Sequence, residues 1–337
     1  MAKALRMGLY LWPTAQHDGG LQRAIWAEAQ GYDDIWLPDG GGMQDALTLA
    51  AAVAARTSRA RICTGVVPVY TRPPAVLATS ALAISRLAPG RFVLGLGSST
   101  EAMVARWYGR EFVKPLTAVK ETVILLRSIL AGEKTDFSGE VFSSKGFRLA
   151  EPVEGGIPIL LAAMGPKMLE MAGQFADGVV LNNFTPVERV PQALEHLDTG
   201  AKRAGKRVED LEVSARVSLT VTDDNESALE TFRREIYGYG STEIYRAVLQ
   251  RMGYGRVAEE MEAGFKARDR ARVLAAIPDE LVAKVFAWGD EETCHARIRA
   301  YYKAGVGTVA IGPISTDPQD FQRTCEAFAP NLFSLPA

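Results

Sequence analysis

Small residues gather where several apolar runs of this chain end. The segment 64–66 (TGV) closes one run, and the segment 95–99 (GLGSS) closes another. A residue without a Cβ atom leaves room for a ligand to approach the backbone, and it tolerates dihedral angles that other residues avoid. The turn residues after Thr64 also suit a strand that simply leaves a sheet through a proline-rich loop. The clusters indicate a ligand site at strand ends more than they indicate packing.

A possible anion site lies at Gly165-Pro166. These residues follow a run of small side chains, and Pro166 stands at the expected first position of a helix with Lys167 beside it. Proline suits that position, and a helix start directs backbone N–H groups and positive charge outward. An ordinary helix start with a favourable proline is the alternative interpretation.

Asp39, Tyr70 and Glu101 could assist proton transfer. Asp39 directly follows an apolar run in WLPDGGGM, where barrel enzymes place working residues, although it could also cap the glycines after it. Glu101 follows the GLGSS segment and could instead be an exposed first-turn carboxylate favoured by the helix dipole. Tyr70 belongs to a loop, so it is a better candidate for a substrate pocket than Tyr10 or Trp12, which suit barrel filling.

Several other chemistries have little support in the sequence. The three histidines, at positions 17, 196 and 295, have no metal-ligand spacing, so a metal site is not expected. The GLG of residues 95–97 lacks the third glycine and the downstream acidic residue of a nicotinamide fingerprint. A serine hydrolase would need a GxSxG elbow, which is missing.

Composition excludes further classes of partner. The chain has 337 residues, 47% hydrophobic and 23% charged, with a formal net charge of -2 and no basic stripe, so neither nucleic acid nor a lipid surface is an expected partner. The longest apolar runs fall well short of the ~20 residues that span a bilayer. Cys63, Cys294 and Cys325 lie far apart, and the first residues lack the apolar run of a signal peptide. A reduced, cytoplasmic protein is expected.

Short β-rich runs alternate with amphipathic helical stretches along the whole chain, as in parallel strands joined by helical crossovers. Eight such repeats predict a single (β/α)8 barrel over residues 1–337, and the usual size of ~250 residues leaves a surplus for insertions. Residues 132–157 are expected to form a β-hairpin excursion, and residues 223–290 a charged helical insertion without a strand; both are possible lids. The predicted strands are 7–11, 34–37, 62–67, 92–96, 159–161, 178–181, 211–221 and 308–311.

The order of these motifs resembles the luciferase-like family of flavin- and deazaflavin-dependent oxidoreductases, particularly the branch that uses the deazaflavin coenzyme F420. The resemblance is carried by TGVVPVYTRPPAVLA (64–78), LAPGRFVLGLG (87–97) and ILLAAMGPKM (159–168), and it extends over nearly the whole chain to AGV at 304–306. Members of this family fold as (β/α)8 barrels, and a homodimer is expected from the resemblance.

The resemblance also implies a coenzyme site. By position, a non-proline cis peptide that supports the coenzyme ring falls at Gly65-Val66, and the segment 162–165 lines the ring edge and the ribityl phosphate. Relatives often carry a histidine after the residue that matches Asp39, but this chain has Gly40 there, which argues against sugar-phosphate dehydrogenase activity. The implied coenzyme residues are Asp39, Thr64, Gly65, Val66, Gly97, Ser98, Ser99, Ala162, Ala163, Met164, Gly165 and Pro166.

The resulting expectation is an F420-dependent oxidoreductase that transfers a hydride between the deazaflavin and a small organic substrate, with Asp39, Tyr70 and Glu101 as catalytic candidates. A flavin mononucleotide (FMN) monooxygenase of the same family would share the barrel and the phosphate end of the site. A coenzyme-binding protein without catalysis is a third possibility, because Gly40 occupies the usual histidine place.

Overall fold

The computed structural model describes residues 4–11, 20–40, 42 and 44–335. Most of its strands are parallel and buried. The described strands are β1 (Arg6–Tyr10), β2 (Asp34–Leu37), β3 (Arg61–Thr64), β4 (Val67–Pro68), β5 (Phe92–Gly97), β6 (Asp136–Ser138), β7 (Ser143–Lys145), β8 (Ile159–Ala163), β9 (Gly178–Leu181), β10 (Glu212–Val221), β11 (Ala287–Gly289) and β12 (Thr308–Pro313).

Eight of the described strands close into a barrel. Strand pairing runs β1-β2-β3-β5-β8-β9-β10-β12 and returns to β1, with every pair parallel. These are the eight strands that the sequence pattern predicts, so the (β/α)8 prediction is confirmed. The predicted strand 62–67 divides into β3 and β4 because the chain leaves the β2–β3 ladder after Thr64, and β4 then pairs with the end of β5.

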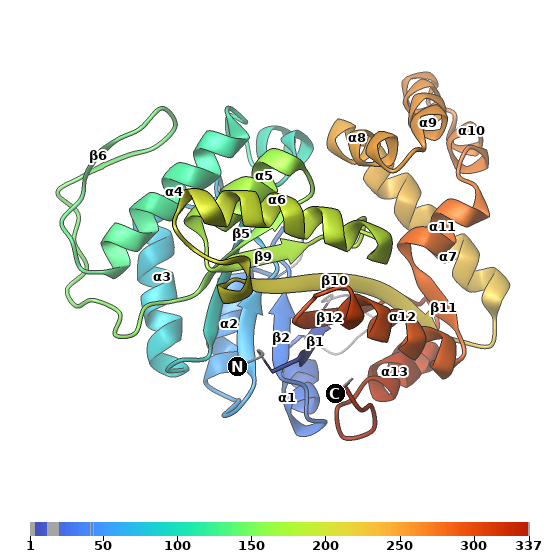
Figure 1. The fold of residues 1–337 in the computed structure, drawn as a ribbon, viewed down its shortest axis with the longest axis horizontal. Helices are drawn as coiled ribbons and strands as arrows, with labels where there is room; N and C mark the ends of the chain where they lie inside the picture. The colour runs from blue at the N-terminus through green and yellow to red at the C-terminus, as the bar shows by residue number, and fades with distance from the viewer. Residues whose placement is uncertain (1–3, 12–19, 41, 43, 336–337) are drawn as a thin grey trace.

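Helices surround the barrel (Figure 1). Their bounds are α1 (Leu21–Ala29), α2 (Ala46–Ala54), α3 (Pro74–Leu87), the π-helix η1 (Ala102–Trp107), α4 (Pro115–Leu130), α5 (Pro166–Phe175), the 3-10 helix η2 (Val187–Arg189), α6 (Val190–Arg203), the 3-10 helix η3 (Val208–Asp210), α7 (Asn225–Gly240), α8 (Glu243–Arg251), α9 (Gly255–Ala267), α10 (Arg270–Ala275), α11 (Asp279–Val285), α12 (Glu291–Lys303) and α13 (Pro318–Ala327).

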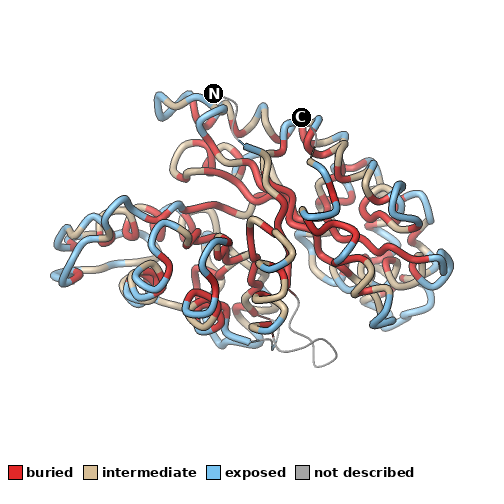
Figure 2. The backbone as a smooth tube through the Cα atoms, turned by 90° about the horizontal axis from the view of Figure 1, so that it is seen from below, coloured by how far each residue is buried: buried red, intermediate tan, exposed pale blue. Residues whose placement is uncertain are grey.

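The hydrophobic core has two layers around the strands. Outward-facing strand residues such as Ile35 and Val217 pack against the helices, whereas inward-facing residues such as Trp36 and Leu160 fill the barrel. Figure 2 shows the buried segments running through the middle of the molecule, with exposed segments outside. Side chains alternate across a strand, so a barrel strand buries both of its faces. Among the described helices, none has the length and apolar character needed to cross a membrane.

The stretch 223–290 lies to one side of the barrel as the group α7–α11 (Figure 1). Its buried residues, which include Phe232 and Met261, form a cluster separate from the barrel core. The expectation that this stretch lacks a strand is wrong. Strand β11 pairs with residues 219–221, the part of β10 that extends past the barrel, and a run of three residues is too short to show strand periodicity.

On the opposite side, β6 and β7 form an antiparallel pair (Figure 1). The buried carboxylate of Glu121 on α4 binds the turn between these two strands; we call residues 136–145 the β6–β7 arm. It accepts hydrogen bonds from the backbone N–H groups of Glu140 at 2.6 Å, Val141 at 3.0 Å and Phe142 at 2.8 Å. Burial acts to raise the pKa of Glu121, but these hydrogen bonds outweigh burial and hold it below its ordinary value.

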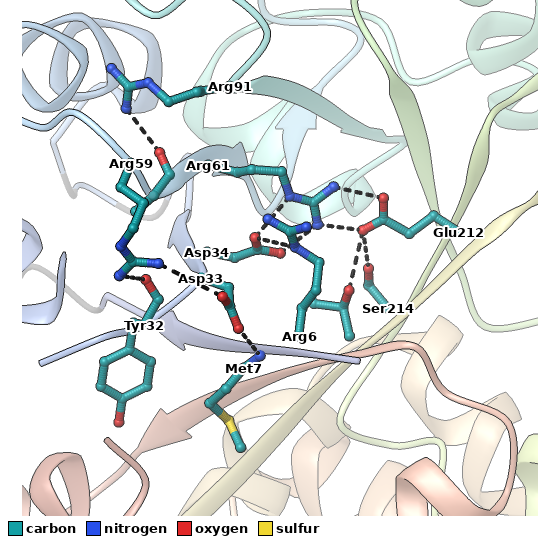
Figure 3. A network of polar contacts seen from close by, with 12 residues as sticks. Arg6, Met7, Tyr32, Asp33, Asp34, Arg59, Arg61, Arg91, Glu212 and Ser214 are labelled. Atoms are coloured by element: carbon teal, nitrogen blue, oxygen red, sulfur yellow. Dashed lines mark hydrogen bonds and ion pairs between the residues drawn. The ribbon is translucent and has the colours of Figure 1, made fainter. Parts of the chain in front are cut away.

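An ion-pair network closes the N-terminal end of the barrel (Figure 3). Asp34 is fully buried and accepts from Arg61 Nε at 2.8 Å and from Arg6 Nε at 3.1 Å. Arg61 also reaches both carboxylate oxygens of Glu212, at 2.8 and 2.9 Å. Burial alone would lower the pKa of Arg61, but its hydrogen bonds to Asp34 and Glu212 raise it. The network stabilises this end of the barrel, and barrel enzymes place their active sites at the opposite, carboxyl end of the strands.

Candidate active site

The carboxyl ends of β3, β5 and β8 meet at the mouth of the barrel. A Cβ atom built on Gly97 would lie 2.8 Å from Val66 Cγ2 and 3.4 Å from Ala162 Cβ. The missing side chain of Gly97 therefore lets Val66 and Ala162 approach each other. The peptide bond between Gly65 and Val66 is cis, as the family resemblance predicts. These residues form an apolar floor at the mouth, which we call the Val66–Gly97–Ala162 floor.

Thr64 lies beneath this floor and joins β3 to β5. Its hydroxyl donates to the Gly95 carbonyl at 2.9 Å and accepts from the Gly95 N–H at 2.8 Å. A Cβ atom on Gly95 would lie 2.0 Å from the Thr64 carbonyl oxygen, so the two backbones approach closely. Thr64 is fully buried, and its position indicates that it supports the floor.

Ser98 and Ser99 lead out of β5. Ser99 has a positive φ of 62° and directs its hydroxyl to Met103 Sδ at 3.2 Å, and the Ser98 hydroxyl donates to the Ser99 carbonyl at 3.3 Å. Gly165 and Pro166 begin α5 beside the end of β8, and the only contact that a Cβ on Gly165 would make within 4 Å, among the described residues, is with Arg251 Nη2 at 3.9 Å. There is therefore free space beside the start of α5, and Arg251 lies at its border.

Asp39 lies at the mouth, after β2, and its carboxylate is paired with Arg72. Arg72 Nη1 donates to it at 2.6 Å, and the backbone N–H of Ala46 donates to it at 3.2 Å. Asp45, which caps α2, forms a second ion pair with Arg72. Burial acts to lower the pKa of Arg72, but these two carboxylates raise it. The arrangement suits Asp39 to position the β2–α2 loop.

Gly40, where relatives often carry histidine, has φ of +115°, and its surroundings are filled. A Cβ atom there would lie 2.2 Å from Met103 Cε and 3.4 Å from the Tyr108 hydroxyl. Both side chains come from the segment that follows β5. Met103 and Tyr108 thus occupy the space beside β2 that a larger residue at position 40 would need.

The other two catalytic candidates differ in their surroundings. Tyr70 is buried, donates its hydroxyl to the Val113 carbonyl at 2.5 Å, and packs on Phe112 and Phe142. Burial raises the pKa of Tyr70 to about 12. Glu101 is exposed at the start of the π-helix η1 and makes no capping hydrogen bond there. Trp12, another candidate wall of the pocket, lies outside the described residues.

A buried polar cluster on the far wall was not predicted. The guanidinium of Arg216 on β10 stacks on the Tyr10 ring, 4.3 Å from its centroid, and donates to the Tyr239 hydroxyl at 3.4 Å. Tyr239 packs against Tyr245, and the Tyr245 hydroxyl accepts from Asn182 Nδ2 at 3.2 Å. This Arg216 cluster joins β1 and β10 to the helices of the insertion.

Electrostatics in the Arg216 cluster favour a permanent positive charge. Burial acts to lower the pKa of Arg216, but the nearby Tyr239 and Tyr10 hydroxyls raise it above its ordinary value. Burial raises the pKa of Tyr10 to about 12, although Arg216 opposes this shift. A sequence signal for the cluster exists, because polar residues at 214, 216, 218 and 220 alternate with apolar ones along β10.

Within the residues that the structure describes, no three histidine, cysteine or acidic side chains gather in a way that could hold a metal ion. The site therefore combines an apolar floor, an open helix start and a buried guanidinium at the mouth of a (β/α)8 barrel. This is the arrangement of a small-molecule site at the carboxyl ends of barrel strands.

The comparisons place this barrel in a family. The model of the luciferase-like monooxygenase family matches residues 14–308, and the chain belongs to that family. It is 30% identical over 290 residues to 5,10-methylenetetrahydromethanopterin reductase of Methanolobus tindarius, covering 85% of this chain and 87% of the relative. It is also 30% identical over 250 residues to F420-dependent glucose-6-phosphate dehydrogenase of Rhodococcus erythropolis, covering 69% and 74% of the two chains.

Solved structures share the fold. The F420-dependent tetrahydromethanopterin reductase of Methanopyrus kandleri superposes with a TM-score of 0.81 at 22% identity, over 98% of both chains. An F420-dependent secondary alcohol dehydrogenase in complex with an F420–acetone adduct superposes with a TM-score of 0.78 at 19% identity, over 98% of this chain and 100% of the other. The match of the family model to residues 14–308 confirms the family resemblance predicted from the sequence motifs.

Proposed function

We propose that this protein is an F420-dependent oxidoreductase that transfers a hydride between the deazaflavin coenzyme and a small organic substrate. The observation that carries the proposal is the Val66–Gly97–Ala162 floor, where strand ends from distant parts of the sequence bring the apolar side chains of Val66 and Ala162 together over Gly97. A planar ring needs such a surface, and a side chain at Gly97 would disrupt it. The name of the 30% identical Rhodococcus relative, an F420-dependent dehydrogenase, supports the same coenzyme, and the names of both 30% identical relatives, a reductase and a dehydrogenase, support the same reaction class.

The residues present fit a deazaflavin with a phosphorylated side chain. Gly65, Val66 and Gly97 would support one face of the ring, while Ala162 and Ala163 would border its edge. The backbone N–H groups at the start of α5, next to Gly165, would bind the phosphate. When bound, the coenzyme supplies two-electron hydride chemistry, and the protein supplies position and electrostatics.

On the opposite wall, the Arg216 cluster would face the substrate. A buried guanidinium favours a substrate that carries a carbonyl, a carboxylate or another oxygen with negative charge. Glu101 keeps an exposed carboxylate near the mouth, which suits proton exchange with bulk water. Asp39 and Tyr70 would act by positioning the surrounding loops, because Arg72 and the Val113 carbonyl engage their polar atoms.

Equilibrium binding of oxidised F420 and of FMN, followed by their absorbance and fluorescence, tests the proposal. We expect saturable binding of F420 and weak binding of FMN. The reduced deazaflavin should then be reoxidised by at least one member of a panel of enones, imines, aldehydes and nitroaromatic compounds. Tight binding of reduced FMN with oxygen consumption and no binding of F420 would instead establish the monooxygenase alternative. Binding of F420 without turnover across the panel would favour the non-catalytic alternative.

A pair of glycine variants tests the floor itself. Gly97→Ala places a Cβ 2.8 Å from Val66 Cγ2, and overpacking of this kind should weaken F420 binding by about tenfold or more. Gly238→Ala is the matched control, because Gly238 lies within α7 and a Cβ there would meet nothing within 4 Å. Equal F420 affinities for the two variants would contradict the proposed ring position. The homodimer expected from the family is tested by sedimentation velocity at assay concentrations.

A further inference from the structure

A cavity lies beside the start of α5. Its volume is about 230 Å³, and residues from three distant parts of the chain line it: Ala163 and Met164 after β8, Arg189 from η2, and Arg251 from α8. Gln192 and His196 of α6 also face it. The cavity begins at the residues assigned to the phosphate end of the coenzyme, and it continues toward the helical insertion.

Two guanidinium groups meet in this cavity. Arg189 donates through Nη1 to the backbone carbonyl of Arg251 and through Nη2 to Gln192 Oε1 at 2.8 Å, and Arg251 Nη2 reaches the Met164 carbonyl at 3.4 Å. Within the described residues, neither arginine forms an ion pair. Glu170, the acid nearest His196, is already paired with Arg203 at 2.7 Å.

The positive charges of Arg189 and Arg251 repel each other. Burial lowers the pKa of Arg251, and the neighbouring charge of Arg189 lowers it further. Backbone carbonyls hold the two groups in place but do not neutralise them. An anion that binds between Arg189 and Arg251 would offset this repulsion, and planar guanidinium groups match carboxylate oxygens well.

The position of the arginines places them close to the phosphate end of the proposed coenzyme site. A Cβ on Gly165 would lie 3.9 Å from Arg251 Nη2, so Arg251 stands next to the helix start, and Arg189 lies beside Arg251, to whose backbone carbonyl it donates. We propose that Arg189 and Arg251 bind the glutamate carboxylates that follow the phosphate in the side chain of F420. FMN ends at its phosphate, so this subsite would distinguish the two coenzymes. The inference rests on the proposed function.

Three deazaflavins test it: the full coenzyme, the phospholactyl form without glutamates, and the tail-free form that ends at the ribityl group. Each is titrated into the intact protein at low and high salt, with ring fluorescence as the readout. The wild type should bind the full coenzyme at least tenfold more tightly than the glutamate-free form, and salt should reduce this difference. Arg251→Gln and Arg189→Gln should each weaken binding of the full coenzyme by about tenfold and leave binding of the glutamate-free form and of the tail-free form unchanged; equal weakening of the full and glutamate-free forms would assign the arginines to the phosphate and overturn the tail subsite.

Two further variants separate charge from folding. Arg251→Lys keeps the charge and should recover part of the lost affinity, whereas Arg234→Gln removes a charge from the exposed surface of α7 and should change nothing. Equal wild-type affinities for the full and glutamate-free forms would overturn the tail subsite while leaving the proposed function intact. Equal weakening of all three ligands by Arg251→Gln would also overturn it. Failure of all three ligands to bind the wild type would overturn the proposed function and the subsite together.

Discussion

The network at the closed end of the barrel predicts a large stability loss for Asp34→Asn. The Asp34 carboxylate has no exposed surface and receives hydrogen bonds from Arg61 Nε at 2.8 Å, from Arg61 Nη2 at 2.5 Å and from Arg6 Nε at 3.1 Å. An asparagine retains one acceptor oxygen but places an NH2 group against a guanidinium. It also removes the carboxylate that pairs with Arg6, while Arg61 keeps its hydrogen bonds to Glu212.

The magnitude follows from the burial of these groups. Removing one partner of a buried ion pair costs about 3–5 kcal/mol, because the remaining charge stays buried without compensation. Glu212 still neutralises part of the charge on Arg61, which itself is 15% exposed, so the lower end applies. We expect Asp34→Asn to reduce the free energy of unfolding by about 3 kcal/mol, which corresponds to roughly 5 °C in Tm for a domain of this size.

Urea unfolding at pH 7, followed by circular dichroism, measures this loss. The control is Asp223→Asn, the same chemical change in a carboxylate that is 85% exposed and paired with Arg323 at 2.9 Å. An exposed pair of this kind contributes about 0–1 kcal/mol. Coenzyme affinity of folded Asp34→Asn should equal that of the wild type, because the network lies at the end of the barrel away from the mouth. A stability loss no larger than that of the control would refute the reasoning.

Further predictions concern the arm and the mouth. The pKa of Glu121 is lowered from 4.5, so its stabilising contribution is present above that pH and is lost as the pH falls through the folded-state value. Glu121→Gln should therefore lower the free energy of unfolding by about 2 kcal/mol at pH 7. In urea titrations this difference from the wild type should shrink below pH 4.5, and a constant difference would contradict the reasoning. Gly40→Ala should lower the free energy of unfolding by about 1–3 kcal/mol, because φ is +115° there. Adding Met103→Ala removes the side chain nearest the new Cβ but should not restore the thermal midpoint. Full restoration would show that the contact with Met103, and not the backbone angle, causes the loss. Arg216→Gln should leave F420 affinity within about threefold of the wild type and lower turnover about tenfold or more. Arg216→Lys, which keeps the positive charge, is the comparison. Loss of coenzyme binding in Arg216→Gln would contradict the prediction.

Much of the scaffold was predictable because it depends on local patterns. Barrel strands are buried on both faces and appear as short continuous apolar runs, and strand ends rich in glycine are equally visible, as at Gly97 and Gly165. The strand β11 escaped prediction because three residues carry no periodicity and its pairing depends on how far β10 extends past the barrel. Asp39 and Tyr70 were predicted as catalytic candidates, but no sequence pattern could indicate that Arg72 and the Val113 carbonyl would engage them.

Residue type and spacing within short segments were enough to predict the eight strands, the family resemblance and the strand ends that bear small residues. Which distant side chains meet became visible once the chain was folded. The stacking of Arg216 on Tyr10, the filling of the space beside Gly40 by Met103, and the approach of Arg189 to Arg251 each join segments far apart in the chain. Contacts of this kind depend on how the closed barrel and the packed helical insertion orient individual side chains, and local sequence patterns do not specify those orientations.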